Sequence, residues 1–224
     1  MENKEYLDLS VHEIKNILSA ISGYSEFISS GIVQGDRILE LAERIKSLSE
    51  ILAGFTDKKY MYDLLHNHLY KPEFEYVLIS ELIQNVKNDV AAHVASPADC
   101  RIDCSQEIEI YGDRLLLKEL LYAVMENASR YSLDKEAAEV SVQMLEEEIV
   151  ISIKNKSEEI TGEDISKLME PYFRVNKEIS RKMGSQGFGL AISAEVMEIH
   201  GGTMKILYDS SYMTVELHFH KIKG

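Results

Sequence analysis

Cysteine, proline and tryptophan are scarce in this chain of 224 residues, which has two cysteines, three prolines and no tryptophan. Cys100 and Cys104 are too few for a disulfide framework, so we expect free thiols in a reducing compartment. The shortage of proline and the lack of low-complexity tracts argue against long disordered linkers. With 45% hydrophobic and 28% charged residues, the composition is that of an ordinary folded protein.

The sequence also lacks an excess of basic residues and any long apolar run. Lys and Arg number 24 against 38 Asp and Glu, for a formal net charge of −14, which disfavours binding to nucleic acid or to an anionic membrane. The first ten residues, MENKEYLDLS, have no apolar core, and no stretch approaches the ~20 apolar residues that span a bilayer. We therefore expect a cytoplasmic protein with no membrane anchor and no nucleic-acid partner.

The first 70 residues have the apolar spacing of two helices. Positions separated alternately by four and three residues are apolar except at Ser25: Leu7, Val11, Ile14, Leu18, Ile21, Ser25, Ile28 and Ile32. The stretch SSGIVQGD interrupts this pattern, which resumes at Ile38, Leu41, Ile45, Leu48, Leu52 and Phe55. The spacing predicts an antiparallel helical hairpin over residues 1–70. Because a lone hairpin buries only one side of each apolar stripe, we expect two copies to form a dimeric four-helix bundle.

Residues 71–224 mix strands with helices. The stretch EFEYVLISELIQNVKNDVAAHV predicts a short strand and then a helix from about Ser80, and CRIDCSQEIEIYGD alternates as strands do. RLLLKELLYAVMENASRYS predicts an amphipathic helix, and GLAISAEVMEIHGG predicts a helix that stops at glycine. AEVSVQMLEEEIVISIKN and TMKILYDSSYMTVELHFH each predict a hairpin of two strands. This order predicts an α+β two-layer sandwich, with one sheet covered by helices.

Several stretches taken together resemble the motifs of two-component sensor histidine kinases. HEIKNILSAISGYSEFI resembles the phosphoacceptor box, and LLYAVMENASRYS resembles the asparagine box of the GHKL-type ATP-binding domain. PYFRV and GSQGFGLAI resemble the phenylalanine box and the second glycine box, and YGDRLLLKELL falls where the family has a helix-leading Gly-Asp. The order and spacing match over nearly the whole chain. The resemblance implies a dimerisation and histidine phosphotransfer hairpin at 1–70 and a GHKL-type ATP-binding catalytic domain at 71–224.

His12 and Asn16 lie four residues apart and so project from one face of the predicted helix. A phosphoacceptor imidazole needs an accessible neutral nitrogen and a neighbouring base that orients the ring. The resemblance makes His12 the phosphorylated residue and Glu13 the partner of its other ring N–H. It also gives Asn16 the role of orienting a water molecule in dephosphorylation. A solvated helix face is the alternative for a lone histidine, and the other motifs favour the phosphoacceptor.

The asparagine box implies part of a nucleotide site. Asn127 interrupts a predicted amphipathic helix, where asparagine is a poor helix former. The resemblance makes its side-chain oxygen a ligand of Mg²⁺, a hard cation that also binds substrate phosphates. Arg130 would then contact phosphate, and Tyr131 would pack on the adenine of ATP. The chain departs from the family at Ala123, where a second asparagine is usual.

The second glycine box implies the phosphate-binding part of that site. Gly184, Gly187 and Gly189 precede a predicted helix, and backbone N–H groups at a helix N-terminus bind anions. The segment from Tyr172 to Gly187 would form a lid over ATP.

The first glycine box departs furthest from the family pattern Asp-x-Gly-x-Gly. NKSEEI places Asn155 at the aspartate that accepts a hydrogen bond from the adenine amino group, with Ser157 and Glu159 at the two glycines. A neutral acceptor in place of a charged one costs on the order of 1–2 kcal/mol, or roughly five- to thirtyfold in affinity. Side chains at the glycine positions would cost about 1 kcal/mol each if the backbone there has positive φ. We therefore expect a weakened nucleotide site.

Three functions are compatible with these motifs and departures. The first is a histidine kinase that autophosphorylates His12 from ATP and Mg²⁺, acting as a homodimer in a two-component system or phosphorelay. It would pass the phosphoryl group to an aspartate of a response-regulator receiver domain and take its signal from a separate sensor or upstream protein. The alternative is a histidine phosphotransferase with a vestigial nucleotide-binding domain that relays phosphoryl groups between response regulators. A non-catalytic scaffold is the third, and the intact His12 argues against it. The Met1 start favours a complete short protein over a kinase fragment.

Overall fold

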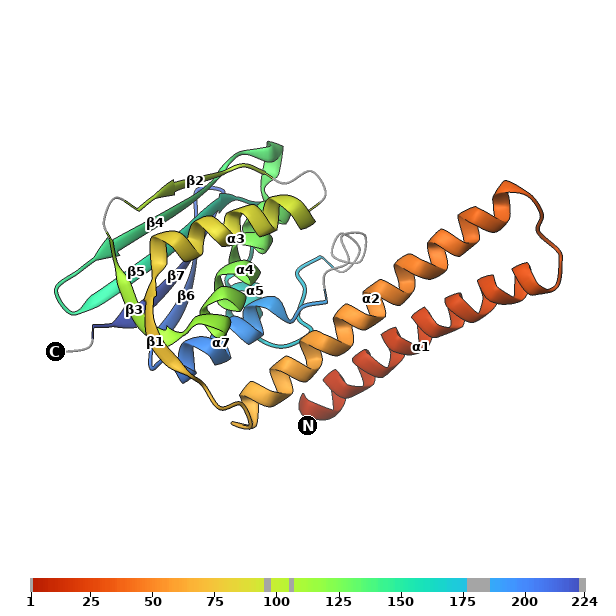
Figure 1. Cartoon of the computed structure of the whole chain (residues 1–224), viewed down its shortest axis with the longest axis horizontal. Coiled ribbons are helices and arrows are strands. Elements are labelled where there is room, and N and C mark those ends of the chain that lie inside the picture. The colour runs from red at the N-terminus through yellow and green to blue at the C-terminus, as the bar shows by residue number, and fades with distance from the viewer. Residues whose placement is uncertain (1, 95–97, 105–106, 177–185, 222–224) are drawn as a thin grey trace. The chain divides into compact units, whose positions relative to one another are not determined.

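The computed structural model describes residues 2–94, 98–104, 107–176 and 186–221, with side chains from residue 14 onward (Figure 1). Two compact units make up the chain, Met1–Met61 and Tyr62–Gly224. The functional boundary near residue 70 stays a prediction. None of the helices in the described ranges combines the length and the apolar content that crossing a membrane requires.

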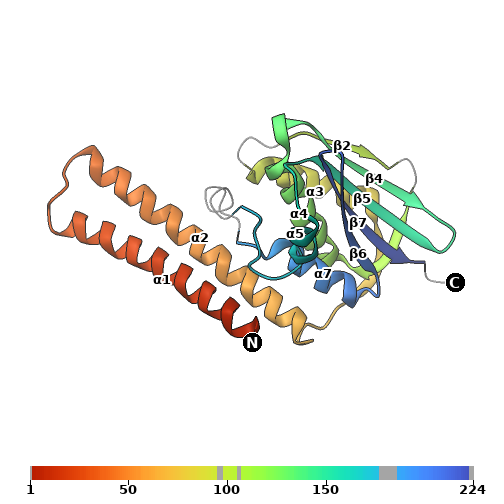
Figure 2. The same ribbon diagram turned by 180° about the vertical axis from the view of Figure 1, so that it is seen from behind.

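Two long helices form the N-terminal hairpin. α1 (Glu2–Ser29) and α2 (Asp36–His66) run antiparallel and lie side by side in both views (Figures 1 and 2). The connection between them contains Gly31 and Gly35, both with positive φ. The helical hairpin that the apolar spacing predicts is therefore confirmed.

The hairpin keeps a large apolar surface in contact with solvent. Ile14, Ile21 and Ile28 of the predicted stripe are half-buried, whereas Leu18 is 49% exposed and Ile32 is 72% exposed. Further exposed apolar side chains in the hairpin are Phe27, Ile38 and Leu39. The packing within one chain thus covers only part of each stripe, as expected for two helices without a further partner.

A five-stranded sheet forms the centre of the second unit. Its strands, in spatial order, are β2 (Cys100–Asp103), β4 (Ala138–Met144), β5 (Glu148–Lys156), β7 (Tyr212–His220) and β6 (Thr203–Asp209). Neighbouring strands are antiparallel, except that β2 runs parallel to β4. Both predicted hairpins, β4–β5 and β6–β7, are confirmed.

Helices cover one face of this sheet (Figure 2). They are α3 (Ile79–His93), α4 (Arg114–Tyr131) and α7 (Gly189–Ile199), and a short α5 (Gly162–Lys167) lies between β5 and the phenylalanine box. The core is made by the inward side chains of α4 and α7 against the sheet: Leu116, Leu117, Leu120, Leu121, Val124, Ile192, Val196, Ile151, Ile153, Val215 and Leu217. The predicted two-layer α+β architecture is confirmed.

The unit differs from the prediction of a single sheet in one respect. β1 (Phe74–Leu78) and β3 (Glu109–Asp113) pair antiparallel in a separate two-stranded sheet. Each of these strands runs directly into a helix, β1 into α3 and β3 into α4. The N–H of Ile79 donates to the carbonyl of Ile108 at 2.9 Å, so the pairing extends to the start of α3. The two strands are therefore held beside the starts of α3 and α4 rather than in the main sheet.

The start of α4 is held by the carboxylate of Asp113, which is buried. Oδ1 accepts hydrogen bonds from the backbone N–H groups of Leu115 and Leu116 at 2.9 and 3.0 Å. Oδ2 accepts from the Tyr70 hydroxyl at 3.1 Å and from the N–H of Glu73 at 2.8 Å. Burial alone would raise the pKa of Asp113, but these four hydrogen bonds together lower it below its usual value. Asp113 thus caps α4 and ties it to the segment before β1.

His200, just after α7, binds the backbone of the same residue, Asp113. Its Nε2 accepts a hydrogen bond from the N–H of Asp113 at 3.0 Å, and its Nδ1–H donates to the carbonyl of Val196 at 2.7 Å. Acceptance by Nε2 requires the neutral imidazole, and burial lowers the pKa of His200. A Cβ on Gly112 would lie 2.6 Å from the His200 ring, so the Gly-Asp of the YGD stretch fits this histidine closely.

We expect mild acid to destabilise the second unit through His200. Its pKa in the folded protein lies below 6.5, while the unfolded chain binds a proton near that value, so unfolding becomes easier as the pH falls below about 6.5. The slope is at most about 1.4 kcal/mol per pH unit. Urea denaturation of the chain across this range measures it. His200→Gln keeps a donor and an acceptor without titrating and should flatten the profile, and an unchanged profile would contradict the assignment.

Candidate functional site

The asparagine box occupies the last turns of α4. Asn127 is half-buried, and its amide makes no hydrogen bond within the described ranges. Arg130 and Tyr131 follow in the same turn and are also half-buried. Nη2 of Arg130 donates to Oε1 of Glu126 at 2.9 Å. The Asn127 side chain thus has an oxygen available to a cation, whereas the predicted phosphate ligand, Arg130, is paired with a carboxylate.

Ala123, where the family usually has a second asparagine, faces the start of α7. A Cβ on Gly189, the first residue of α7, would lie 3.6 Å from the Cβ of Ala123, an ordinary contact distance. The asparagine box and the second glycine box are therefore neighbours at this point.

The base of the predicted lid is closed by a backbone hydrogen bond. The N–H of Tyr172 donates to the carbonyl of Gly187 at 2.9 Å, which joins the two ends of the segment. Gly187 has φ +75°, and a Cβ there would lie 2.8 Å from the carbonyl carbon of Tyr172. This glycine is therefore required by the backbone, whereas Gly189 is not. The third predicted residue, Gly184, lies outside the described residues.

Phe188, between these two glycines, anchors the lid base in a row of aromatic rings that the sequence did not predict. Its side chain is 1% exposed, with the Tyr172 ring centroid at 4.6 Å and the Tyr62 centroid at 5.9 Å. The Tyr62 ring stacks on the His66 ring, with 5.2 Å between the ring centroids. Nδ1 of His66 lies 2.8 Å from Oε1 of Glu195 on α7. The GFG spacing marks a phosphate-binding turn but carries no signal for these aromatic contacts, because Tyr62 and His66 lie more than a hundred residues away.

Asn155, at the predicted adenine contact, is 2% exposed near the end of β5. Its Nδ2 donates to the carbonyl of Lys156 at 3.1 Å. Its Oδ1 is buried, and no group in the described part of the chain donates to it. A buried acceptor without a donor costs about 1–3 kcal/mol. A ligand with an amino group would satisfy this oxygen.

The side chains at the two glycine positions of the first glycine box cause no backbone strain. Neither Ser157 nor Glu159 has positive φ, so the condition for a cost of about 1 kcal/mol at each position is not met. The N–H of Ser157 instead donates to the carbonyl of Ser211 at 2.9 Å, and Ser157 is 5% exposed. The segment after β5 has become part of the packing against the β6–β7 turn.

The predicted phosphoacceptor residues belong to the first unit. His12 and Glu13 lie in α1, but their side chains fall outside the described ones. Asn16 follows one turn later and is exposed. In the second unit, Asn127 lies on α4, which packs against both β5, the strand of Asn155, and α7, the helix of Gly189.

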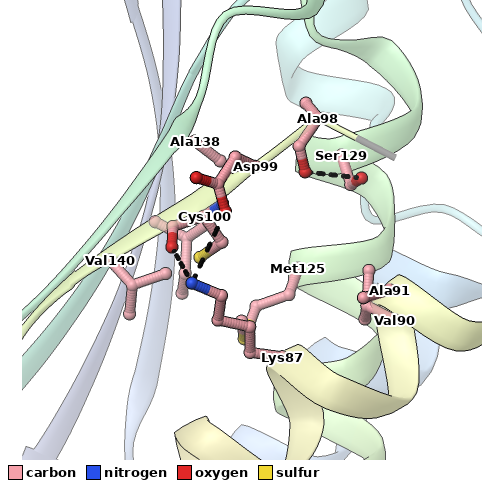
Figure 3. Close-up of a pocket in the computed structure, with 11 residues that line it drawn as sticks. Lys87, Val90, Ala91, Ala98, Asp99, Cys100, Met125, Ser129, Ala138 and Val140 are labelled. Atoms are coloured by element: carbon pink, nitrogen blue, oxygen red, sulfur yellow. Dashed lines mark hydrogen bonds and ion pairs between the residues drawn. The ribbon is translucent and has the colours of Figure 1, made fainter. Parts of the chain in front are cut away.

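A separate cavity of about 220 Å³ lies between α3, α4 and the β2–β4 edge of the sheet (Figure 3). α4 contributes Met125 and Ser129 to it, while Asn127 between them projects from the opposite face of the helix. Lys87 lines the cavity and donates to the carbonyl of Cys100 at 2.6 Å. Cys100 and Cys104 are half-buried and are not joined in a disulfide, and burial raises the pKa of the Cys100 thiol to about 11. None of the residues that the motifs assign to the nucleotide lines this cavity.

Comparison with known proteins identifies the domain. Residues 112–221 match the family described as "Histidine kinase-, DNA gyrase B-, and HSP90-like ATPase". The chain is 25% identical over 214 residues to "Sensor histidine kinase WalK" of Bacillus subtilis, an alignment that covers 90% of this chain and 34% of that protein. It is also 25% identical over 209 residues to "Heme sensor protein HssS" of Staphylococcus aureus, covering 91% and 43% respectively. The chain thus spans less than half the length of these curated relatives.

A solved structure extends the likeness of fold to both units. The Acinetobacter baumannii histidine kinase AdeS matches with a TM-score of 0.75 at 18% sequence identity, over 93% of this chain and 97% of that one. Residues 112–221, within the second unit, thus match an ATPase domain of the histidine kinase, gyrase and HSP90 class. The predicted resemblance of the chain to the core of sensor histidine kinases is confirmed.

Gly187→Ala should destabilise the lid base. The added Cβ would meet the Tyr172 backbone at 2.8 Å, with φ at +75°, so we expect a loss of about 1–3 kcal/mol in the free energy of unfolding. Gly189→Ala is the matched control, since its Cβ would make an ordinary contact at 3.6 Å. Urea denaturation without nucleotide compares the two variants. Equal losses would show that the hydrogen-bonded lid base does not require this glycine.

Proposed function

We propose that the chain is the catalytic core of a histidine kinase. The second unit binds ATP with Mg²⁺, the γ-phosphoryl group goes to His12, and the phosphoryl group then passes to an aspartate of a response-regulator receiver domain. The match to the ATPase family and the relatives named as sensor histidine kinases support this proposal. They favour it over a phosphotransferase that makes no use of ATP.

The observation that carries the proposal is the unpaired Oδ1 of Asn155. It is buried at the position of the adenine contact and has no donor in the described part of the chain. The N6 amino group of adenine is a donor of the right kind. Nδ2 is already bonded to the carbonyl of Lys156, which leaves Oδ1 as the atom of the amide that can meet a donor. The nucleotide site is thus weakened by the loss of a charge, but its acceptor is kept.

The donor set also fits Mg²⁺. Within the described residues, no three His, Cys, Asp or Glu side chains are grouped as metal ligands. Mg²⁺ needs no such cage, because nucleotide phosphates and water supply most of its oxygen ligands. Asn127 would contribute one side-chain oxygen. When bound, the metal neutralises charge on the phosphates during transfer.

At the acceptor, a ring nitrogen of His12 attacks the γ-phosphorus. The new N–P bond forms as the bond to the ADP oxygen breaks, and Glu13 holds the N–H of the other ring nitrogen. Asn16, one turn further along α1, would orient a water molecule when the phosphohistidine or the regulator is dephosphorylated. Positioning and electrostatic stabilisation account for most of the rate in such transfers.

The exposed apolar face of the hairpin supports a homodimer. Leu18 and Ile32 would be covered by the same residues of a second copy in a four-helix bundle. The matched relatives are more than twice as long as the aligned region, and signal input would come from outside the two units described here.

Autophosphorylation tests the function directly. Incubation with γ-labelled ATP and Mg²⁺ should place acid-labile label on the wild-type chain and none on His12→Ala or Asn127→Ala. The two variants separate the steps, because His12→Ala should still bind ATP while Asn127→Ala should bind Mg²⁺·ATP weakly. Absence of label on the wild type, with His12 still accepting phosphoryl from a phosphorylated receiver domain, would replace the kinase with a relay protein.

Asn155→Ala should weaken nucleotide binding only by removing the hydrogen bond to the adenine base. Loss of one neutral hydrogen bond lowers affinity about two- to twelvefold, and the factor should be the same for adenosine and for ATP. Calorimetric titration measures both ligands. Ser152→Ala on the same strand, outside the site, is the control and should leave both affinities unchanged. Unaltered ATP affinity in Asn155→Ala would remove this residue from the site.

A further inference from the structure

Glu126 is an acidic residue inside the asparagine box that no motif assigns to a function. Its Oε1 lies 2.9 Å from Nη2 of Arg130, one turn further along α4. The side chains are only 15% and 26% exposed, so this pair is screened less than a surface ion pair. Glu126 directly precedes Asn127, the proposed Mg²⁺ ligand.

Glu126 has a tyrosine neighbour on the side away from Arg130. Tyr122 lies one turn earlier on α4, and burial together with the Glu126 charge raises the pKa of Tyr122. Tyr122, Glu126 and Arg130 follow one another at intervals of four residues along one side of the helix. The Glu126 side chain therefore lies between the Tyr122 and Arg130 side chains.

The pairing with Glu126 affects how Arg130 can bind phosphate. Arg130 lies in the last turn of α4, where the partial negative charge of the helix C-terminus already attracts it. Glu126 adds a full negative charge beside the same guanidinium. A nucleotide phosphate must therefore compete with the Glu126 carboxylate for Arg130 and must approach that carboxylate as well.

We infer that Glu126 is a positioning residue that restrains Arg130 and lowers the affinity of the site for the phosphate groups of a nucleotide. The inference rests on the proposed function, since it concerns the same ATP site. Together with the neutral acceptor at Asn155, Glu126 then keeps the affinity of the site for ATP low. The fraction of sites that hold ATP therefore changes with the concentration of ATP.

The test is nucleotide binding by the full chain and by Glu126→Gln, measured by calorimetric titration with ATP, ADP and adenosine. Removal of the charge should tighten ATP about three- to tenfold and ADP by a smaller factor, because the effect is electrostatic and grows with phosphate charge. Adenosine affinity should not change. Glu119→Gln, an exposed site on the same helix, makes the same change in net charge and should leave all three affinities unaltered.

A second pair of variants tests whether the effect of Glu126 on ATP affinity depends on Arg130. In an Arg130→Met background, Glu126→Gln should change ATP affinity by less than about twofold, since the restrained partner is gone. A uniform change for adenosine, ADP and ATP would mean that Glu126 only stabilises α4, and it would overturn the inference. Weaker binding of ATP in Glu126→Gln that appears only with Mg²⁺ would also overturn it, by making Glu126 a metal ligand. If the wild type binds none of the three ligands, the proposed function fails first.

Discussion

The buried carboxylate of Asp113 is the interaction on which the second unit depends. It accepts four hydrogen bonds, two from the first turn of α4 and two from the segment that enters β1. The His200 ring accepts a hydrogen bond from the backbone N–H of the same residue and so connects the end of α7 to the start of α4. α4 and α7 carry the asparagine box and the second glycine box. The geometry of the nucleotide site therefore depends on hydrogen bonds made at the start of α4 and just after the end of α7.

The chemistry of the site combines retained and altered groups. Asn155 keeps a buried acceptor at the base contact, and Asn127 keeps an oxygen for a cation, but neither supplies a charge. Glu126 places a carboxylate against Arg130, the predicted phosphate ligand of the asparagine box. In the proposed nucleotide site, each change should weaken binding by a modest factor rather than abolish it.

Much of the fold could be predicted because local patterns and global packing agree. The heptad spacing of α1 and α2, the two hairpins and the amphipathic α4 all lie where the sequence predicts them. The prediction failed for the two-stranded sheet, because alternation identifies β3 as a strand without identifying β1 as its partner. At Ser157 and Glu159 the sequence could not decide whether the backbone has positive φ, and the structure shows that it does not.

By itself, the sequence determined the order of elements, the class of the domain and the residue types available at each motif, since these follow from periodicity and spacing along the chain. Only the tertiary structure decided how those residues are used. It paired Arg130 with Glu126, left Oδ1 of Asn155 without a donor in the described part of the chain, and made Gly187 indispensable while Gly189 is not. The reason is physical: burial, close approach and hydrogen-bond satisfaction depend on distances between groups in the folded chain, and spacing within one segment does not contain them.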